Sequence, residues 1–219
     1  MKPRTTFLLH GAGQNPPSWQ DVVTRLGGER SLVAPWLKGL KPTQGFSFDL
    51  GAAVGDLATQ VETRGLDRVD LVGNTLGGIV ALRFAAELPD RVGRLVLVNT
   101  PVMPSRGVLR VQRALTRLMP ESRFTEAGVT KRAVMEALRA MGEANLSVDL
   151  GAVRAPVLAV VGSGDQMASA SVDLLRQAIP DLRVESLAGT DLLRDQPAAL
   201  ADLVAEFLAT DDEPDQAEG

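Results

Sequence analysis

The chain has 219 residues, of which 45% are hydrophobic, with a formal net charge of −4, one histidine and no cysteine. This length supports one substantial core, and the lack of cysteine excludes disulfides, thiolate catalysis and cysteine-ligated metals. The single histidine excludes a histidine-rich metal site, and an acidic chain lacks the basic excess that nucleic-acid binders need.

Short β-branched or leucine-rich runs alternate with longer amphipathic segments, which is typical of a parallel sheet with helices on both faces. Proline stands near the start of the first and last predicted helices, where it suits a helix N-terminus. The predicted strands span residues 5–10, 31–35, 69–73, 94–99, 156–162 and 182–186, and the predicted helices span 17–26, 50–64, 76–87, 169–178 and 197–208.

The alternation breaks between Thr100 and Asp149, where no strand pattern occurs. Two or three helices are predicted there, including SRGVLRVQRALTRLM (105–119) and TKRAVMEALRAMGEA (130–144). An insertion after a strand of a doubly wound sheet would lie over the carboxyl ends of the strands, where such sheets bind ligands. We therefore interpret residues 101–150 as a lid on a single domain that spans residues 1–209.

Residues 210–219 form an acidic end with little to bury, so we expect this tail to be disordered. The short apolar stretch near the N-terminus ends at His10, far short of a signal-peptide core, and no apolar run is long enough to cross a bilayer. We therefore expect a cytoplasmic protein with no membrane partner and no nucleic-acid partner.

Four motifs follow one another in the order FLLHGAGQNPPSW (7–19), LVGNTLGG (71–78), APVLAVVGSGD (155–165) and LAGTDLLRDQPAAL (187–200). In this order the chain resembles the α/β-hydrolase superfamily over nearly its whole length. The resemblance implies an α/β-hydrolase fold, that is, a mostly parallel, doubly wound sheet with a helical lid, here lacking the usual first two strands. We expect no cofactor and no metal.

A dinucleotide-binding loop is the competing interpretation of HGAG. That fingerprint requires Gly-x-Gly-x-x-Gly, and after Gly11 and Gly13 its last position is Pro16, which prevents the close packing of helix on strand. The hydrolase-like interpretation is therefore favoured.

By resemblance, Gly73-Asn74-Thr75-Leu76-Gly77 is the nucleophile elbow, which places Thr75 where the family has its serine. The backbone N–H groups of Ala12 and Leu76 fall at the oxyanion-hole positions. Asp165 matches the acidic member of the triad. A β-branched residue fits poorly in the strained turn of an elbow, so Thr75 is either a hindered nucleophile or a residue that only forms a hydrogen bond.

The histidine of the triad has no counterpart. One alignment puts Asp191 at its position and another puts Thr190 there, and no histidine follows His10. Acyl transfer needs a base with a pKa near 7, which an ordinary carboxylate of pKa about 3.9 replaces badly. We therefore expect slow or absent hydrolysis.

Two groups are alternative acid–base candidates. His10 lies at the end of a predicted central strand and begins the His-Gly-x-Gly stretch, which by resemblance is the oxyanion loop. There it either braces this loop or exchanges protons. Asp165 and Asp191, if they lie close together in a partly dry pocket, would favour a shared proton; otherwise they cap helices or brace loops.

The lid contributes apolar and basic side chains. Four of the six methionines fall in it, and we predict that Met103 and Met119, together with Met167 and Asn74, bind a hydrophobic substrate. Packing of these methionines on the core is the alternative.

Arginine recurs on one face of the first lid helix, opposite a face of valine and leucine. This stripe is either a solvated surface or a site for an anionic or carrier-bound group. Its arginines are Arg106, Arg110, Arg113 and Arg117.

Taken together, the chain has the fold, the oxyanion loop and the lid of the family that it resembles, but it lacks the histidine that would act as the base in acyl transfer. This favours a non-hydrolytic enzyme that acts on a small hydrophobic metabolite by acid–base chemistry: a cyclase, isomerase or lyase, for example one that closes a C–C bond or opens an epoxide. The alternatives are a non-catalytic ligand-binding protein and a weak esterase or thioesterase that uses Thr75. The sequence does not predict an oligomeric state.

Overall fold

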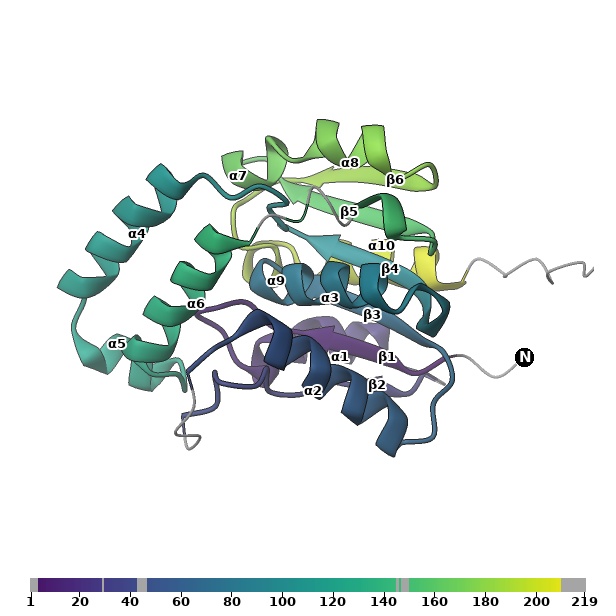
Figure 1. The fold of residues 1–219 in the computed structure, drawn as a ribbon, viewed down its shortest axis with the longest axis horizontal. Helices are drawn as coiled ribbons and strands as arrows, with labels where there is room; N and C mark the ends of the chain where they lie inside the picture. Colours follow the sequence, from purple (N-terminus) through teal and green to yellow (C-terminus); the bar gives the residue numbers. More distant parts are fainter. Residues whose placement is uncertain (1–3, 29, 43–46, 145, 147–149, 210–219) are drawn as a thin grey trace, which may run out of the picture.

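A single six-stranded parallel sheet forms the centre of the molecule (Figure 1). The computed structural model describes residues 4–28, 30–42, 47–144, 146 and 150–209, so the predicted acidic tail at 210–219 lies outside the described residues. The strand order is β2-β1-β3-β4-β5-β6. The strands are β1 (Thr6–Leu9), β2 (Leu32–Val33), β3 (Val69–Asn74), β4 (Val92–Val98), β5 (Val157–Gly162) and β6 (Leu182–Leu187).

Helices cover both faces of this sheet, which confirms the doubly wound, parallel α/β sheet expected from the sequence. The helices outside the lid are α1 (Gln20–Leu26), α2 (Leu50–Thr63), α3 (Leu76–Glu87), α7 (Gln166–Ser169), α8 (Val172–Ala178), α9 (Leu192–Asp195) and α10 (Pro197–Ala209), with one-turn 3₁₀ helices at η1 (Pro16–Trp19), η2 (Pro89–Arg91) and η3 (Leu150–Ala152). Every strand pair that these residues form is parallel.

The two faces of the sheet bury separate hydrophobic cores. On one face α2 and α3 pack on the sheet together with apolar residues of the lid segment, and on the other α1 and α10 pack against each other and the sheet. The strands β3 and β4 are fully buried because they contribute side chains to both cores, which explains their near-continuous apolar sequences.

Residues 101–150 contain three helices, α4 (Arg106–Leu118), α5 (Glu121–Glu126) and α6 (Lys131–Glu143), which lie beside the carboxyl ends of the strands (Figure 1). Ser105 caps α4 and Thr130 caps α6, each by accepting a hydrogen bond from a backbone N–H three residues on. We keep the name lid segment for residues 101–150. Among the described residues, no helix is both long and apolar enough to cross a membrane.

Glycine sets how closely α3 approaches the sheet. A methyl group at Gly77 would overlap the backbone of Leu9 in β1, and one at Gly73 would overlap the backbone of Gly77 and Gly78. Only glycine therefore allows the start of α3 to rest directly on β1 and β3. This contact fixes the turn between β3 and α3, which carries Thr75.

We predict that Gly77→Ala lowers the free energy of unfolding by about 3 kcal/mol, because the added methyl group meets rigid backbone. Gly55→Ala, in the exposed middle of α2 where nothing lies within 4 Å of the added atom, is the matched control and should raise it by about 0.5 kcal/mol through helix propensity. Urea denaturation of both variants measures the difference. Equal effects would contradict the close-contact explanation.

Candidate functional site

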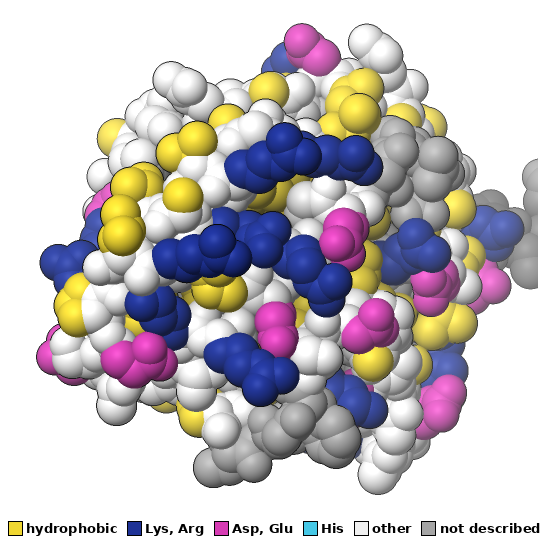
Figure 2. Space-filling view, turned by 60° about the vertical axis from the view of Figure 1, so that its left-hand side comes forward, with side chains coloured by type: hydrophobic (Ala, Val, Ile, Leu, Met, Phe, Trp, Pro, Cys, Tyr) yellow, Lys and Arg dark blue, Asp and Glu magenta, His cyan; other side chains and the backbone are white. Residues whose placement is uncertain are grey.

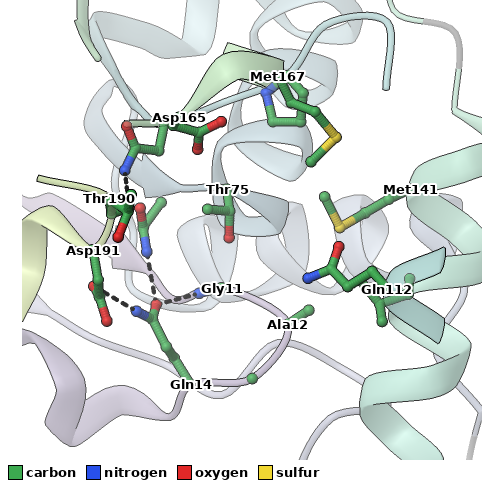
Figure 3. Close-up of a pocket in the computed structure, with 15 residues that line it drawn as sticks. Gly11, Ala12, Gln14, Thr75, Gln112, Met141, Asp165, Met167, Thr190 and Asp191 are labelled. Carbon is green, nitrogen blue, oxygen red and sulfur yellow. Dashed lines mark hydrogen bonds between the residues drawn. The ribbon is translucent and has the colours of Figure 1, made fainter. Parts of the chain in front are cut away.

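A cavity of about 250 Å³ opens at the carboxyl ends of the strands, between the sheet and the lid segment (Figure 3). The sheet side contributes the loop after β1 and the ends of β3 and β4, and the lid segment contributes α4 and α6. Of the predicted site residues, Ala12, Asn74, Thr75, Asp165, Met167 and Asp191 line the cavity. Thr190 lines it as well, so both candidates for the histidine position face the same space.

Thr75 sits in the turn between β3 and α3 with φ 48° and ψ −107°. A positive φ is rare for a β-branched residue, so the surrounding contacts hold Thr75 in a strained conformation. Its backbone N–H donates to the carbonyl of Val98 at 2.8 Å, which ties the turn to β4. Within the described residues, its hydroxyl forms no hydrogen bond and lies against Gly11.

The start of α3 presents backbone N–H groups beside Thr75. The first intrahelical hydrogen bond runs from the N–H of Ile79 to the carbonyl of Thr75, so the N–H of Leu76 precedes the helical ladder. The positive end of the helix dipole adds to the attraction for negative charge. Ala12, from the loop after β1, lines the cavity opposite. This geometry suits a ligand oxygen that carries or develops negative charge.

Gln14 joins three parts of the pocket, namely the loop after β1, the end of β3 and the loop before α9, and was not among the site residues predicted from the sequence. Its side-chain oxygen accepts hydrogen bonds from the N–H of Gly11 (3.0 Å) and from the amide of Asn74 (2.8 Å), and its amide donates to Asp191 (3.5 Å). Figure 3 shows these bonds meeting at Gln14. Its position directly after the His-Gly-x-Gly stretch is the signal in the sequence that could have identified it. The oxygen of the buried Asn74 amide has no partner in the described structure.

Asp165 and Asp191 do not form a relay with Thr75. Asp165 accepts a hydrogen bond from the N–H of Ala168 at 3.0 Å and so caps the short helix α7, while Asp191 points to Gln14. Both carboxylates are half-buried, and no hydrogen bond joins them to each other or to Thr75 in the described part of the chain. Each carboxylate is thus turned to a separate partner, which is the arrangement of the helix-capping and loop-bracing alternative.

Asn99, also missed by the sequence analysis, fastens the two loops that carry these carboxylates. It follows β4 with φ 45°, donates its amide to the carbonyl of Thr190 at 2.9 Å and accepts from the N–H of Gly162 at 2.7 Å. Asp195 then accepts from the N–H groups of Thr190 and Asp191. A polar residue at the end of a buried strand next to β3 was the available signal for Asn99.

His10 lies outside the cavity lining. Its side chain is fully buried, its Nδ1 donates to the carbonyl of Gly11 at 2.9 Å, and its Nε2 accepts from the N–H of Leu37 at 3.2 Å. Its ring also packs edge-on against Trp36. Burial lowers the pKa of His10 to about 4, despite the opposing effect of the hydrogen bond to Gly11. With both nitrogens engaged, His10 braces the oxyanion loop, and the structure does not bring it to Thr75 as an acid–base group.

The lid segment reaches the cavity through Gln112, Leu138 and Met141 (Figure 3). Met103 and Met119, which the sequence analysis assigned to substrate binding, lie outside the lining and are 54% and 38% exposed. Both flank the ends of α4, on the outside of the lid. Among the described residues, no group of three or more His, Asp or Glu side chains is placed to hold a metal ion.

Comparison with known proteins gives one family and a range of relatives. The model of the alpha/beta hydrolase family matches residues 7–203. The 2-hydroxy-6-oxo-2,4-heptadienoate hydrolase of Pseudomonas putida is 39% identical over 98 residues, which cover 42% of this chain and 36% of that enzyme. The pimeloyl-[acyl-carrier protein] methyl ester esterase of Aliivibrio salmonicida is 30% identical over 154 residues, which cover 69% of this chain and 57% of the esterase.

The chain thus spans between about a third and just over half of the length of these curated relatives. Among solved structures, the enol-lactonase from Burkholderia xenovorans superposes with a TM-score of 0.84 at 19% identity, covering 95% of this chain and 92% of the lactonase. At that identity the likeness concerns the fold alone.

We predict that Thr75→Gly raises the free energy of unfolding by about 1 kcal/mol, because glycine adopts a positive φ without strain. Asn99→Gly is the control at the other non-glycine residue with a positive φ among those described. It should be destabilising, because it removes the hydrogen bonds to Gly162 and Thr190. Urea denaturation measures both, and a destabilised Thr75→Gly variant would show that the turn is not strained.

We predict that stability decreases as the pH falls from 7 to 5. The folded pKa of His10, about 4, lies below its ordinary value of 6.5, so the unfolded chain binds the proton first. That single residue removes roughly 2 kcal/mol over this range. His10→Gln, which cannot titrate, should be less stable at pH 7 but should lose less stability over the same interval. Identical slopes for the two proteins would contradict a neutral, buried imidazole.

Proposed function

Because the chain belongs to the alpha/beta hydrolase family, we propose that the pocket around Thr75 binds a small metabolite through a carbonyl oxygen and changes it by acid–base chemistry, without an acyl-enzyme intermediate. The observation that carries this proposal is the combination at Thr75: the strained turn and the helix N-terminus are kept, while the one histidine is turned away into the core.

Binding would centre on the oxygen of the ligand. The N–H groups of Leu76 and Ala12 would stabilise negative charge on a carbonyl, enolate or opened-epoxide oxygen. The rest of the molecule would occupy the space between Met141 and Met167, which adapt to irregular apolar shapes, with the Gln112 amide available for a polar substituent. A cavity of about 250 Å³ suits a small metabolite.

Acyl transfer is disfavoured by the lack of a proton acceptor at Thr75. The attacking hydroxyl must lose a proton to a base within hydrogen-bond distance, and that base must later protonate the leaving group. In the described structure neither Asp165 nor Asp191 is bonded to Thr75. Asp165 and Asp191 instead line the cavity as carboxylates that can exchange a proton directly with a bound ligand.

The name of one relative favours a substrate with keto or enol groups. The relative from Pseudomonas putida is named for a 2-hydroxy-6-oxo-2,4-heptadienoate, and the relative from Aliivibrio salmonicida is named for a methyl ester. Both names are those of hydrolases, and none of the proteins named above is a cyclase, isomerase or lyase. Proton transfer on a keto–enol substrate is the reaction that combines the first of these names with a pocket that lacks the histidine base.

A non-catalytic ligand-binding role is the second candidate. It is favoured by the hydrogen bonds that hold Asp165 on α7 and Asp191 on Gln14, since both carboxylates already serve the structure. Such a protein would retain a metabolite without changing it.

Incubation of purified protein with an extract of small metabolites from its host tests the proposal. We expect a metabolite to be consumed by the wild type and to persist with Asp165→Asn or Asp191→Asn, as followed by mass spectrometry. Asp173→Asn, an exposed carboxylate on α8 paired with Arg176, is the matched control and should behave as wild type. A metabolite that is bound but unchanged by all proteins would instead establish the ligand-binding role.

Restoring a histidine tests why hydrolysis is disfavoured. We predict that wild-type protein cleaves small nitrophenyl esters at near the background rate, and that Thr75→Ser combined with Asp191→His or with Thr190→His raises the rate at least tenfold. The more active combination identifies the position of the lost base. Efficient ester cleavage by the wild type, with an acyl group on Thr75 detected by mass, would overturn the proposal in favour of a threonine esterase.

A further inference from the structure

The outer surface of α4 carries an apolar stripe in contact with solvent. Valine and leucine recur along it at spacings of three, four and three residues, which places them on one face of the helix. All the exposed large hydrophobic side chains found in the described structure lie on this stripe or at the ends of α4. They are Met103, Val108, Val111, Leu115, Leu118 and Met119, with exposed fractions between 38% and 84%.

The opposite flank of α4 is basic. Arginines at spacings of four, three and four residues lie two positions away from the apolar residues, hence on the other side of the helix. None of them forms an ion pair within the described residues, and α4 contains no acidic residue. They are Arg106, Arg110, Arg113 and Arg117. Figure 2, which brings the lid side of the molecule forward, shows basic side chains gathered across this surface with hydrophobic ones beside them.

The basic flank borders a groove of about 310 Å³ between α4 and α6. Arg106, Arg110, Arg113 and Arg139 line the groove together with one carboxylate, Glu143, which lies 3.7 Å from Arg139. The Nε of Arg113 is buried without a hydrogen-bond partner in the described structure. An excess of positive charge therefore extends along this side of the lid segment.

The helix is attached to the protein by one narrow edge. Only Leu109 and Thr116 of α4 are buried, and α4 packs chiefly on α6. At its end, the ammonium of Lys131 donates to the carbonyls of Arg117 and Met119 at 2.7 Å. Because the helix rests on this edge, the apolar flank and the basic flank are exposed at the same time.

We propose that α4 is a membrane-surface helix, whose apolar stripe enters the interface of an anionic lipid bilayer while its arginines are attracted to the headgroups. A strongly segregated helix with low overall hydrophobicity, arginine on its polar face and aliphatic residues on the other is the pattern of helices that lie in a membrane interface. This inference does not depend on the proposed function.

Other binding partners would complement only one of the two exposed flanks of α4. A second copy of the chain could cover the apolar stripe but would leave the arginines uncompensated, and an acidic protein could bind the arginines but would leave the apolar stripe in water. No membrane partner was expected from the sequence, because no apolar run is long enough to span a bilayer. Helical periodicity does not tell whether an apolar stripe is covered by the protein's own core.

Binding at this helix would place a lipid surface next to the cavity. Gln112 belongs to the same helix, lines the cavity beside Thr75 and sits between the buried edge and the apolar stripe. A hydrophobic ligand that partitions into the bilayer would therefore leave it near the opening that Gln112 borders.

Sedimentation with lipid vesicles tests the proposal. We expect the full chain to pellet with vesicles of equal parts phosphatidylcholine and phosphatidylglycerol, to pellet weakly with phosphatidylcholine alone, and to dissociate as salt is raised. Val111→Gln combined with Leu115→Gln should abolish binding. Arg110→Gln combined with Arg117→Gln should weaken binding by about fivefold for each arginine.

The matched control is Arg154→Gln combined with Arg176→Gln, which makes the same change in net charge at exposed ion pairs away from the lid segment. It should bind as wild type, and all variants should melt near the wild-type temperature because the replaced side chains are exposed. Failure to pellet with the anionic vesicles overturns the proposal. So does a wild-type dimer in size-exclusion chromatography that the Val111 and Leu115 changes convert to a monomer, since the stripe would then join two copies.

Discussion

The start of α3 rests directly on the backbone of β1 and β3, with no side chain between them, and the rest of the pocket is arranged around that contact. Because Gly77 allows the approach, the turn before α3 is forced into the conformation that gives Thr75 its positive φ. The same approach brings the loop after β1 against that turn, so that Gly11 lies beside the Thr75 hydroxyl. Backbone packing therefore maintains the shape of the turn that carries Thr75.

Buried polar side chains then fix the loops around this frame. Asn99 joins β5 to the loop before α9, and Gln14 joins the loop after β1 to that same region through Asp191. These bonds use groups that would otherwise face a ligand. The site consequently combines a geometry that suits an oxyanion with two carboxylates that already form structural hydrogen bonds. For this reason acid–base catalysis and ligand binding without catalysis are the two candidate functions.

The fold was largely predictable from the sequence, because strands buried on both faces and amphipathic helices leave strong periodic signals. The residues around the elbow were also predictable, since glycines that permit close packing stand at fixed positions in the chain. The hydrogen-bond partners of the site residues were not predictable. Which carboxylate meets Gln14, and how both nitrogens of His10 are used, depend on loops brought together from distant parts of the chain. The exposure of Met103 and Met119 could not be predicted either, because the sequence does not show whether an apolar side chain is covered by the core or faces solvent.

Val102 connects the start of the lid segment to the chain that follows α6 and to α8. The N–H of Leu146 donates to the carbonyl of Val102, and the N–H of Val102 donates to the hydroxyl of Ser171 beside α8. Lys131 ties α6 to the end of α4, Asn15 donates its amide to the carbonyl of Ala127, and α6 buries its apolar side chains in the core that also contains α3. The lid segment is therefore held at several separate places, so that widening the pocket would require these contacts to break together.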